Sequence, residues 1–449
     1  MSVDTLQWIL VIGISLLLFV LAPLAKTEKA FFKGEGEKGK PNFFLLTSSL
    51  VISWLFAKSI TNAANLGLSF GIVGGVAYAG YYLSFVVAGL IIYKLRTKGG
   101  FESIHHFLEH KFGKPSLIIF SLLISFRLLN EVWSNSMVIG SYFGVQGTTP
   151  YFLAIIVFTT LTVLYTLKGG MSSSLFTDMV QMILFGILLM VILFSIFPKT
   201  DWDVGAFVTS GTWTMSQGVN LLLMAIVQAL SYPFHDPVLT DRGFVSDPKT
   251  TRKAYLWSAV IGGTCIILFS FVGVYGRMEG VVGEAPVEVA KLLGVPMMLL
   301  MNFIMITSAA STLDSTFTSY SKLVHLDLKL AKTTLTGGRI SMIVIAVLGT
   351  IPVFFNPDII SATTISGTMV IGLAPVFLFW NMKVPPLSFY LAVGGGFVMT
   401  ALMLLFPMPD YLLFTTGKYS DLLAVNIYGS IMCFSLFLLP KLVLFVTKK

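Results

Sequence analysis

The chain has 449 residues, of which 55% are hydrophobic and only 11% are charged. Soluble globular proteins carry roughly 25% charged residues, so this composition excludes a set of water-exposed domains. The 38 phenylalanines exclude a disordered chain. The two cysteines, Cys265 and Cys433, lie inside apolar segments, which excludes a disulfide-rich secreted scaffold. The composition therefore predicts a polytopic membrane protein.

Apolar segments follow one another along the chain, and each is close to the roughly 20 residues that span a bilayer as a helix. We expect thirteen spans, at 7–25, 43–65, 72–93, 116–142, 150–167, 173–197, 219–238, 255–276, 293–321, 338–355, 361–381, 386–406 and 422–446. The first is too long for the apolar part of a signal peptide and no basic residue precedes it, so we expect it to be retained.

The basic residues predict how these spans are oriented. Most of the 29 Lys and Arg residues fall in one alternating set of connecting segments, and the opposite set contains only Lys199, Arg277, Lys291 and Lys418. Because basic loops stay in the cytoplasm, we expect the N-terminus outside a cell membrane and the C-terminus inside. The same loops explain the net charge of +8, so no nucleic-acid partner is expected.

The connecting segments show no equipment for catalysis. They contain no Gly-rich phosphate loop and no CxxC pair, and none is long enough for a nucleotide-binding domain. His105, His106 and His110 lie in an amphipathic stretch, which we expect to form a solvated or interfacial helix face rather than a metal site. We therefore expect a protein that is not an enzyme and that moves a solute passively or by coupling to an ion.

The ninth predicted span is the richest in hydroxyl groups. Three- and four-residue spacing places four of them on one helix face, namely Ser308, Ser311, Thr312 and Ser315. With the carboxylate of Asp314 close by, these oxygens suit a hard cation such as Na⁺; a seam of small residues between packed helices is the alternative. Asp178, in the sixth span, either completes such a site or lies toward the cytoplasm.

Two predicted spans are interrupted by polar residues or prolines. The second contains Ser53 and Asn62, and the seventh contains Pro233 and Pro237. Freed backbone groups are tolerated inside a membrane where they line a cavity, and matching interruptions in two halves indicate an inverted-repeat transporter. We expect residues 43–197 and 219–381 to form the two repeats, with additional helices at 7–25 and 386–446.

Several motifs resemble the sodium/solute symporter family, which includes sodium-coupled proline, sugar, pantothenate and urea carriers. The segment LYTLKGGMSSSLFTDMVQ (Leu164–Gln181) is similar to the family signature. The triplet Ser311-Thr312-Leu313, followed by Asp327, matches the family's ninth span, and FESIHHFLEHKFG resembles its basic loop. The resemblance implies an all-α fold with a LeuT-like five-plus-five inverted repeat, thirteen transmembrane helices and an outside N-terminus.

The resemblance also implies where the coupling ion, Na⁺, binds. It assigns backbone carbonyls of the second and ninth spans, with two hydroxyls of the ninth, to one site: Ser48, Val51, Ser308, Ser311 and Thr312. Some family members have a second sodium site, whose positions here are Asp178, Ser311, Asp314 and Ser315. The aspartate at 314, where hydroxyl or small residues are commoner, departs from the family pattern and either strengthens a cation site or introduces a proton-titrating group.

Charged residues in the second and fourth spans mark where the solute is expected. Arg127 and Glu131 share a helix face and either neutralise each other or grip a substrate carboxylate. Lys58 either snorkels outward or anchors an anion, and Trp54 and Asn135 are candidates for the pocket wall. An anionic or zwitterionic solute is favoured if Lys58 and Arg127 face the cavity, and a neutral solute if they do not.

We therefore expect a sodium-coupled secondary active symporter that imports a small polar organic solute of the amino acid, carboxylate, sugar or urea type by alternating access. Its expected partners are the solute, Na⁺ and the lipid bilayer. The alternatives are a proton-coupled or uncoupled carrier of the same fold and, less favoured, a transporter-like membrane sensor, which would normally carry a signalling domain.

Overall fold

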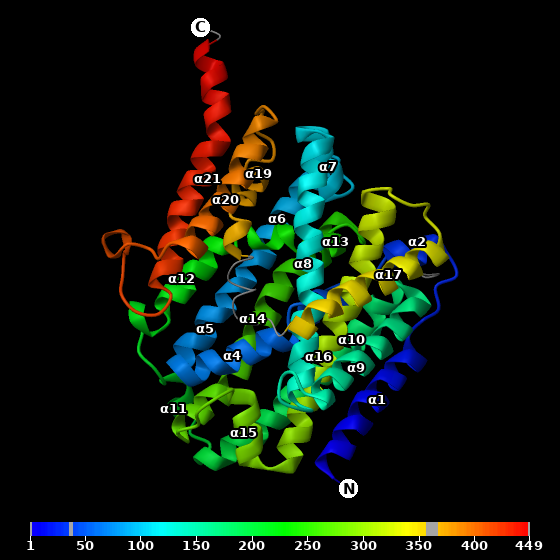
Figure 1. The fold of residues 1–449 in the computed structure, drawn as a ribbon, viewed down its shortest axis with the longest axis vertical. Coiled ribbons are helices and arrows are strands. Elements are labelled where there is room, and N and C mark those ends of the chain that lie inside the picture. Colours follow the sequence, from blue (N-terminus) through cyan, green and yellow to red (C-terminus); the bar gives the residue numbers. More distant parts are fainter. Residues whose placement is uncertain (1, 36–38, 356–366, 448–449) are drawn as a thin grey trace.

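The computed structural model describes residues 2–35, 39–355 and 367–447, and its elements are all helices (Figure 1). Within these residues, 10 helices are long and apolar enough to cross a membrane, or 11 if a bent pair is counted as one span. The chain is thus a multi-pass membrane protein. The expected span at 219–238 consists of short pieces, and part of the span expected at 361–381 lies outside the described residues, so the count of thirteen stays a prediction.

The helices of the first half are α1 (Val3–Leu21), α2 (Glu28–Lys33), α3 (Phe43–Ile52), α4 (Ala57–Phe70), α5 (Ile72–Ala79), α6 (Leu83–Thr97), α7 (Ile104–Phe112), α8 (Lys114–Ser141), α9 (Thr149–Gly169), α10 (Met171–Ile196) and α11 (Val204–Val208). Those of the second half are α12 (Val219–Gln228), η4 (Tyr232–His235), α13 (Pro237–Arg242), α14 (Pro248–Met278), α15 (Ala285–Leu293), α16 (Val295–Lys322), η5 (Leu323–Asp327), α17 (Leu335–Thr350), α19 (Leu373–Leu378), α20 (Leu387–Leu405) and α21 (Ser420–Thr447). The short turns η1–η3, η6 and η7 link them.

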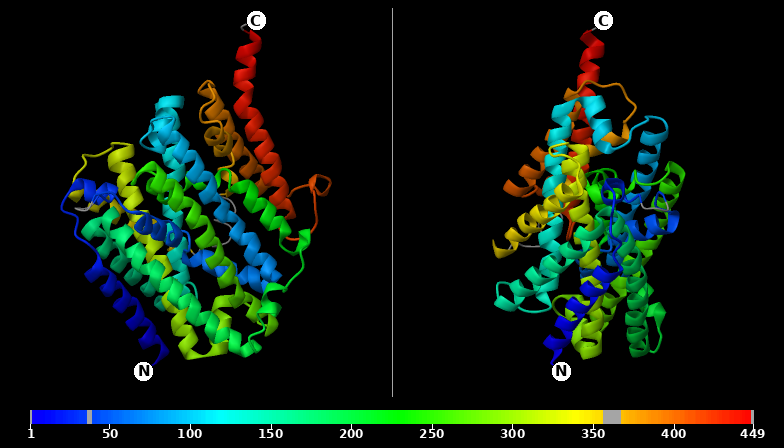
Figure 2. Two further views of the ribbon diagram at one scale, coloured as in Figure 1. Left: turned by 180° about the vertical axis from the view of Figure 1, so that it is seen from behind. Right: turned by 90° about the vertical axis from the view of Figure 1, so that its right-hand side faces the viewer.

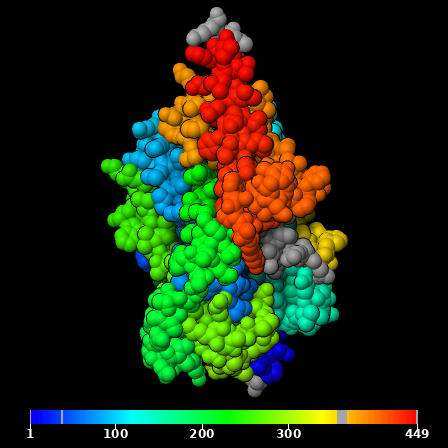
Figure 3. Space-filling model, turned by 90° about the vertical axis from the view of Figure 1, so that its left-hand side faces the viewer, coloured from blue at the N-terminus to red at the C-terminus, as the bar shows by residue number. Residues whose placement is uncertain are grey.

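The two ends of the chain lie at opposite ends of the molecule (Figures 1 and 2). Short helices α11 and α15 cap the end near the N-terminus, whereas α2, α7 and α13 lie toward the other end (Figure 1). Helix α21 packs on α12 along one side (Figure 3). Large apolar side chains such as Leu122, Leu402 and Val443 are exposed on the outer helices, as expected of surfaces that face lipid.

The second predicted span is a broken helix. Helix α3 ends at Ile52, α4 begins at Ala57, and the two axes differ by 60°. At the break the Ser53 hydroxyl donates to the carbonyl of Leu50 at 3.0 Å, a local bond that competes with continued helix. The interruption expected from the polar residues of this span is confirmed.

The seventh predicted span is broken as well, by its prolines. Helix α12 ends at Gln228, and Pro233 lies in the single turn η4 that follows, where a proline cannot donate a helical hydrogen bond. Helix α13 then starts at Pro237, with the Asp236 carboxylate accepting from the backbone nitrogen of Leu239 at 3.1 Å. The chain therefore has both of the expected interruptions.

Helices α4 and α14 approach so closely that only glycine fits between them. A Cβ atom added at Gly273 would lie 1.7 Å from the carbonyl oxygen of Ala64, and one added at Gly67 would lie 2.2 Å from that of Ser270. Small residues at such crossings are typical of helix packing in membranes. This contact fixes α4, and with it the break after α3, against the long helix α14.

Candidate ion and solute sites

The hydroxyl-rich face of α16 is fully inside the protein and meets helix α10. Its Ser308, Ser311 and Thr312 are buried. The Ser311 hydroxyl donates to Oδ1 of Asp178 at 2.5 Å, whereas the Thr312 hydroxyl donates to the carbonyl of Ser308 at 3.0 Å. Among the described residues, the Ser308 hydroxyl has no hydrogen-bond partner. Two hydroxyls of this face therefore form hydrogen bonds within the protein, and this arrangement is compatible with both alternatives, a cation site and a packing seam.

Helix α3 reaches the same carboxylate from the other side. Ser48 and Val51 are buried in its last two turns, and the neighbouring Ser49 hydroxyl donates to Oδ2 of Asp178 at 2.5 Å. The carbonyl of Val51 already accepts from the backbone nitrogens of Trp54 and Leu55, each at 3.1 Å. The end of α3, where the helix dipole is negative, and the hydroxyl face of α16 thus meet at Asp178, and oxygen donors of this kind fit Na⁺.

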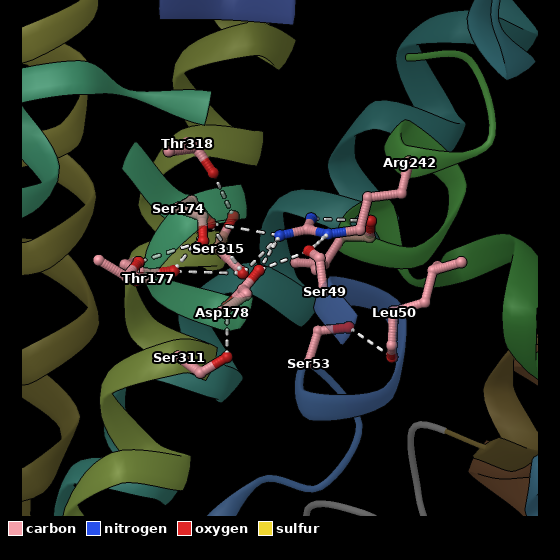
Figure 4. Close-up of polar contacts among 12 residues, drawn as sticks. Ser49, Leu50, Ser53, Ser174, Thr177, Asp178, Arg242, Ser311, Ser315 and Thr318 are labelled. Atoms are coloured by element: carbon pink, nitrogen blue, oxygen red, sulfur yellow. Dashed lines mark hydrogen bonds and ion pairs between the residues drawn. The ribbon is translucent and has the colours of Figure 1, made fainter. Parts of the chain in front are cut away.

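The predicted second cation site contains a cation that belongs to the chain. Arg242 is fully buried, and its Nη2 atom donates to Oδ2 of Asp178 at 2.9 Å and to the Ser315 hydroxyl at 2.7 Å (Figure 4). Its Nε atom donates to the Ser49 hydroxyl at 2.5 Å. By sequence alone Arg242 counts among the basic residues of the connecting segments, but its side chain turns into the bundle instead of facing water.

Asp314, the second acidic position of that predicted site, has a separate set of partners. Four hydroxyls surround its carboxyl group: those of Tyr165 and Ser174 at 2.8 Å, of Thr177 at 2.9 Å and of Ser315 at 3.3 Å. The structure therefore brings Asp178, Asp314 and Ser315 together, as the sequence suggested, but each carboxyl group is already enclosed by donors from the chain.

The residues predicted to contact the solute form one buried network of charges. Nζ of Lys58 lies 2.9 Å from Oε1 of Glu131, and Arg127 is ion-paired with the same carboxylate and with Asp236, at 3.7 Å. The side chain of Asn135 donates to Oε2 of Glu131 at 2.8 Å. Two basic and two acidic groups thus neutralise one another, which agrees with the self-neutralising alternative for Arg127 and Glu131.

Next to this network lies a cavity of about 220 Å³ between α4, α5, α12 and the start of α21. Its walls are mainly aromatic rings and neutral polar groups, including Trp54, Ser59, Asn62, Tyr78, Tyr81 and Tyr232, and one charged residue, Lys418, also lines it. Neither Lys58 nor Arg127 is among the described residues that line it. The cavity begins at the break after α3, where Trp54 also donates to Asp236 at 3.0 Å, and reaches Asn65 and Ser69 near the end of α4.

Sequence reasoning assigned no site role to two residues that the structure places at the centre of these sites, Asp236 and Arg242. The Asp236-Pro237 pair is a signature of a helix N-terminus. That signal predicts a short helix in which Arg242 occupies the second turn, instead of a loop. The remaining partners, such as Tyr165 and Thr177, gave no signal, because a single tyrosine or threonine in an apolar span usually packs or bonds to its own backbone.

A third cluster of charges lies at the end of α16. Lys322 pairs with Asp241 at 2.6 Å and with Asp327 at 2.9 Å, and Asp327 lies 3.5 Å from Nδ1 of His105. Burial lowers the pKa of His105, and the attraction of Asp327 does not offset it. The expectation of a solvated face holds for the exposed His106 and His110 and is wrong for His105, which is buried.

No family model matches the chain. It is 26% identical over 187 residues to sodium/glucose cotransporter 1 of Mus musculus, and the matched segment covers 38% of this chain and 27% of that protein. It is 22% identical over 165 residues to sodium/glucose cotransporter 4 of Danio rerio, which covers 34% and 24%. The chain thus spans about a quarter of the length of these curated relatives.

Solved structures match over nearly the whole chain. A Na⁺-coupled sialic acid symporter in a substrate-bound outward-open state superposes with a TM-score of 0.72 at 15% identity, covering 97% of this chain and 98% of that one. A nucleobase-cation-symport-1 family transporter gives 0.61 at 13% identity, covering 94% and 95%. At such identities these matches show the fold alone, which is the LeuT fold. Sodium cotransporters among the sequence relatives, together with this fold, confirm the resemblance of the chain to the sodium/solute symporter family.

Proposed function

We propose that the protein is a sodium-coupled symporter that carries a small, uncharged polar solute by alternating access. The observation that carries this proposal is the junction of α3 and α16. There a broken membrane helix ends beside a buried row of hydroxyls, and Ser49 and Ser311 reach one carboxylate, Asp178, from opposite sides. Buried oxygen donors of this kind, next to an interrupted helix, are what a transported hard cation requires.

Within this proposal each residue of the first ion site has a role. Ser311 and Thr312 supply hydroxyl oxygens from α16, and Ser48, Val51 and Ser308 supply carbonyl oxygens. An ion held between the end of α3 and α16 joins the two helices, so its arrival and departure favour different arrangements of them. One charge moved through a membrane potential of about 100 mV gains about 2.3 kcal/mol, which corresponds to roughly fifty-fold accumulation of the solute.

The aromatic cavity is the proposed solute site. Its ring-lined walls with amide and hydroxyl groups suit a ligand that stacks on rings and exchanges neutral hydrogen bonds. Recognition of charge by Lys58 and Arg127 is disfavoured, because both already face Glu131 and Asp236. Lys418, the lysine of the cavity wall, lies over the rings of Phe70 and Tyr419. Of the solute classes considered from the sequence, sugars and urea-type compounds therefore fit better than carboxylates.

The proposal includes the finer topology expected from the sequence. It has thirteen crossings of the cell membrane, an outside N-terminus and two five-helix repeats over 43–197 and 219–381. The opposite positions of the two termini in Figure 1 support an odd number of crossings.

Introducing single cysteines at Ser2 and Lys441 and labelling them from outside in whole cells tests the orientation. Labelling at Ser2 alone is expected, and labelling at Lys441 alone would reverse it.

A ligand screen followed by flux measurement tests the function. Purified protein is heated with sugars, amino acids, carboxylates and urea, each with NaCl or with choline chloride. The proposal expects the melting temperature to rise with a neutral solute and to rise further when Na⁺ is present. Stabilisation by carboxylates alone would contradict the solute class, and stabilisation that ignores Na⁺ would favour the proton-coupled or uncoupled carrier.

A further inference from the structure

We propose that Arg242 is a built-in cation that takes the place of a second sodium ion, so that the protein binds and moves one Na⁺ per cycle. This inference rests on the proposed function and specifies its ion stoichiometry. It begins from a disagreement: the oxygens that the family pattern assigns to a second sodium site are present, but a guanidinium group is bound among them.

The guanidinium of Arg242 uses all three of its nitrogen atoms inside the protein. Nε and Nη2 donate to four side chains, and Nη1 donates to the carbonyl of Val238 at 3.2 Å. The side-chain acceptors come from three helices: Ser49 of α3, Asp178 and Ser174 of α10, and Ser315 of α16. With the side chain completely buried, the positive charge has no water to offset it and depends on Asp178.

Both carboxylate oxygens of Asp178 in turn already accept hydrogen bonds from the chain. Oδ1 accepts from Ser311 at 2.5 Å, and Oδ2 accepts from Ser49 at 2.5 Å and from Arg242 at 2.9 Å (Figure 4). A sodium ion bound to Asp178 would lie next to the guanidinium, and two like charges in a buried site disfavour each other strongly. The arginine must leave before a second ion can bind there.

The position of Arg242 in the chain keeps its charge in place. It is the last residue of α13, a short helix that begins at Pro237 and is capped by Asp236. The adjacent carbonyl of Gly243 is held by Nη1 of Arg96 at 2.8 Å. A charge tethered in this way neutralises Asp178 without crossing the membrane, so it contributes nothing to the coupling energy, unlike a second ion.

Counting bound ions tests the inference independently of transport. Purified protein is equilibrated with radioactive Na⁺, with ionic strength held constant by choline chloride, and bound ions per chain are measured. We expect one ion for the wild type, one for R242K, and two for R242Q, in which Asp178 loses its partner. R339Q is the control: Arg339 is a partly buried arginine whose Nε atom donates to the carbonyl of Leu167 at 2.9 Å, away from Asp178, and this variant is expected to bind one ion.

Two further variants guard against a folding defect. D178N/R242Q removes both charges of the pair and should bind one ion, whereas T312A should lose the remaining one. Two ions on the wild type, or one ion on well-folded R242Q, would overturn the inference while leaving sodium coupling intact. No bound sodium on the wild type would refute the proposed function itself. If R242Q does not fold, the counts for the wild type and D178N/R242Q still decide.

Discussion

Replacing Glu131 with glutamine should destabilise the protein far more than a surface charge change does. Glu131 neutralises Lys58 at 2.9 Å and Arg127 in a buried site and accepts from Asn135 at 2.8 Å. Removing one partner of a buried ion pair typically costs about 3–5 kcal/mol, because the remaining charge is left unpaired. That is a large part of a usual unfolding free energy of about 5–15 kcal/mol. The double variant K58M/E131Q should recover part of the lost stability. In it only Arg127 lacks the Glu131 carboxylate, and Asp236 still faces Arg127.

The assay is unfolding by SDS in mixed micelles, followed by tryptophan fluorescence. Glu288 provides the control, because its pair with Lys291 at 2.7 Å is exposed to water. E288Q should change the unfolding free energy by no more than about 1 kcal/mol. The reasoning is refuted if E131Q costs no more than E288Q, or if K58M/E131Q is less stable than E131Q alone.

Three other outcomes are expected. T312A should raise the Na⁺ concentration that gives half-maximal uptake while T312S retains the wild-type value; equal sodium dependence in all three proteins would remove Thr312 from the ion site. His105 is buried and its pKa is lowered from 6.5, so below pH 6.5 its imidazole is protonated more readily in the unfolded chain than in the folded chain. The melting temperature should therefore fall as the pH drops below 6.5, and it should fall less in H105Q. G273A should destabilise the protein by about 1–3 kcal/mol through overpacking. The control G13A, whose new Cβ meets nothing within 4 Å, should be close to neutral. Similar melting temperatures for the two variants would contradict the α4–α14 contact.

The membrane class, most spans and both helix interruptions could be predicted from the sequence, because each depends on local composition. About twenty apolar residues form a span, and a proline such as Pro233 favours a break because it cannot donate a helical hydrogen bond. The association of Asp178 with Ser311 was also expected, because the family resemblance assigns both to one cation site.

The partners of these groups depended on tertiary structure and were not predictable in the same way. Arg242 is only a few residues from the basic segment 249–253, so charge counting assigned it to the same loop. Its burial follows from the packing of α13 against α3 and α16, which no local pattern reports. Likewise, the sequence placed Lys58 and Arg127 near the solute, but the structure shows that Glu131 pairs with both and that Asp236 also faces Arg127.

Solute uptake into proteoliposomes tests the central claim most directly. A neutral solute identified by the ligand screen is supplied outside, with Na⁺ outside and K⁺ inside, and valinomycin sets an inside-negative potential. We expect accumulation above the outside concentration that persists with a proton ionophore and disappears when Na⁺ is equal on both sides and the potential is abolished. Accumulation that is indifferent to Na⁺, or that collapses with the proton ionophore alone, would contradict sodium-coupled symport.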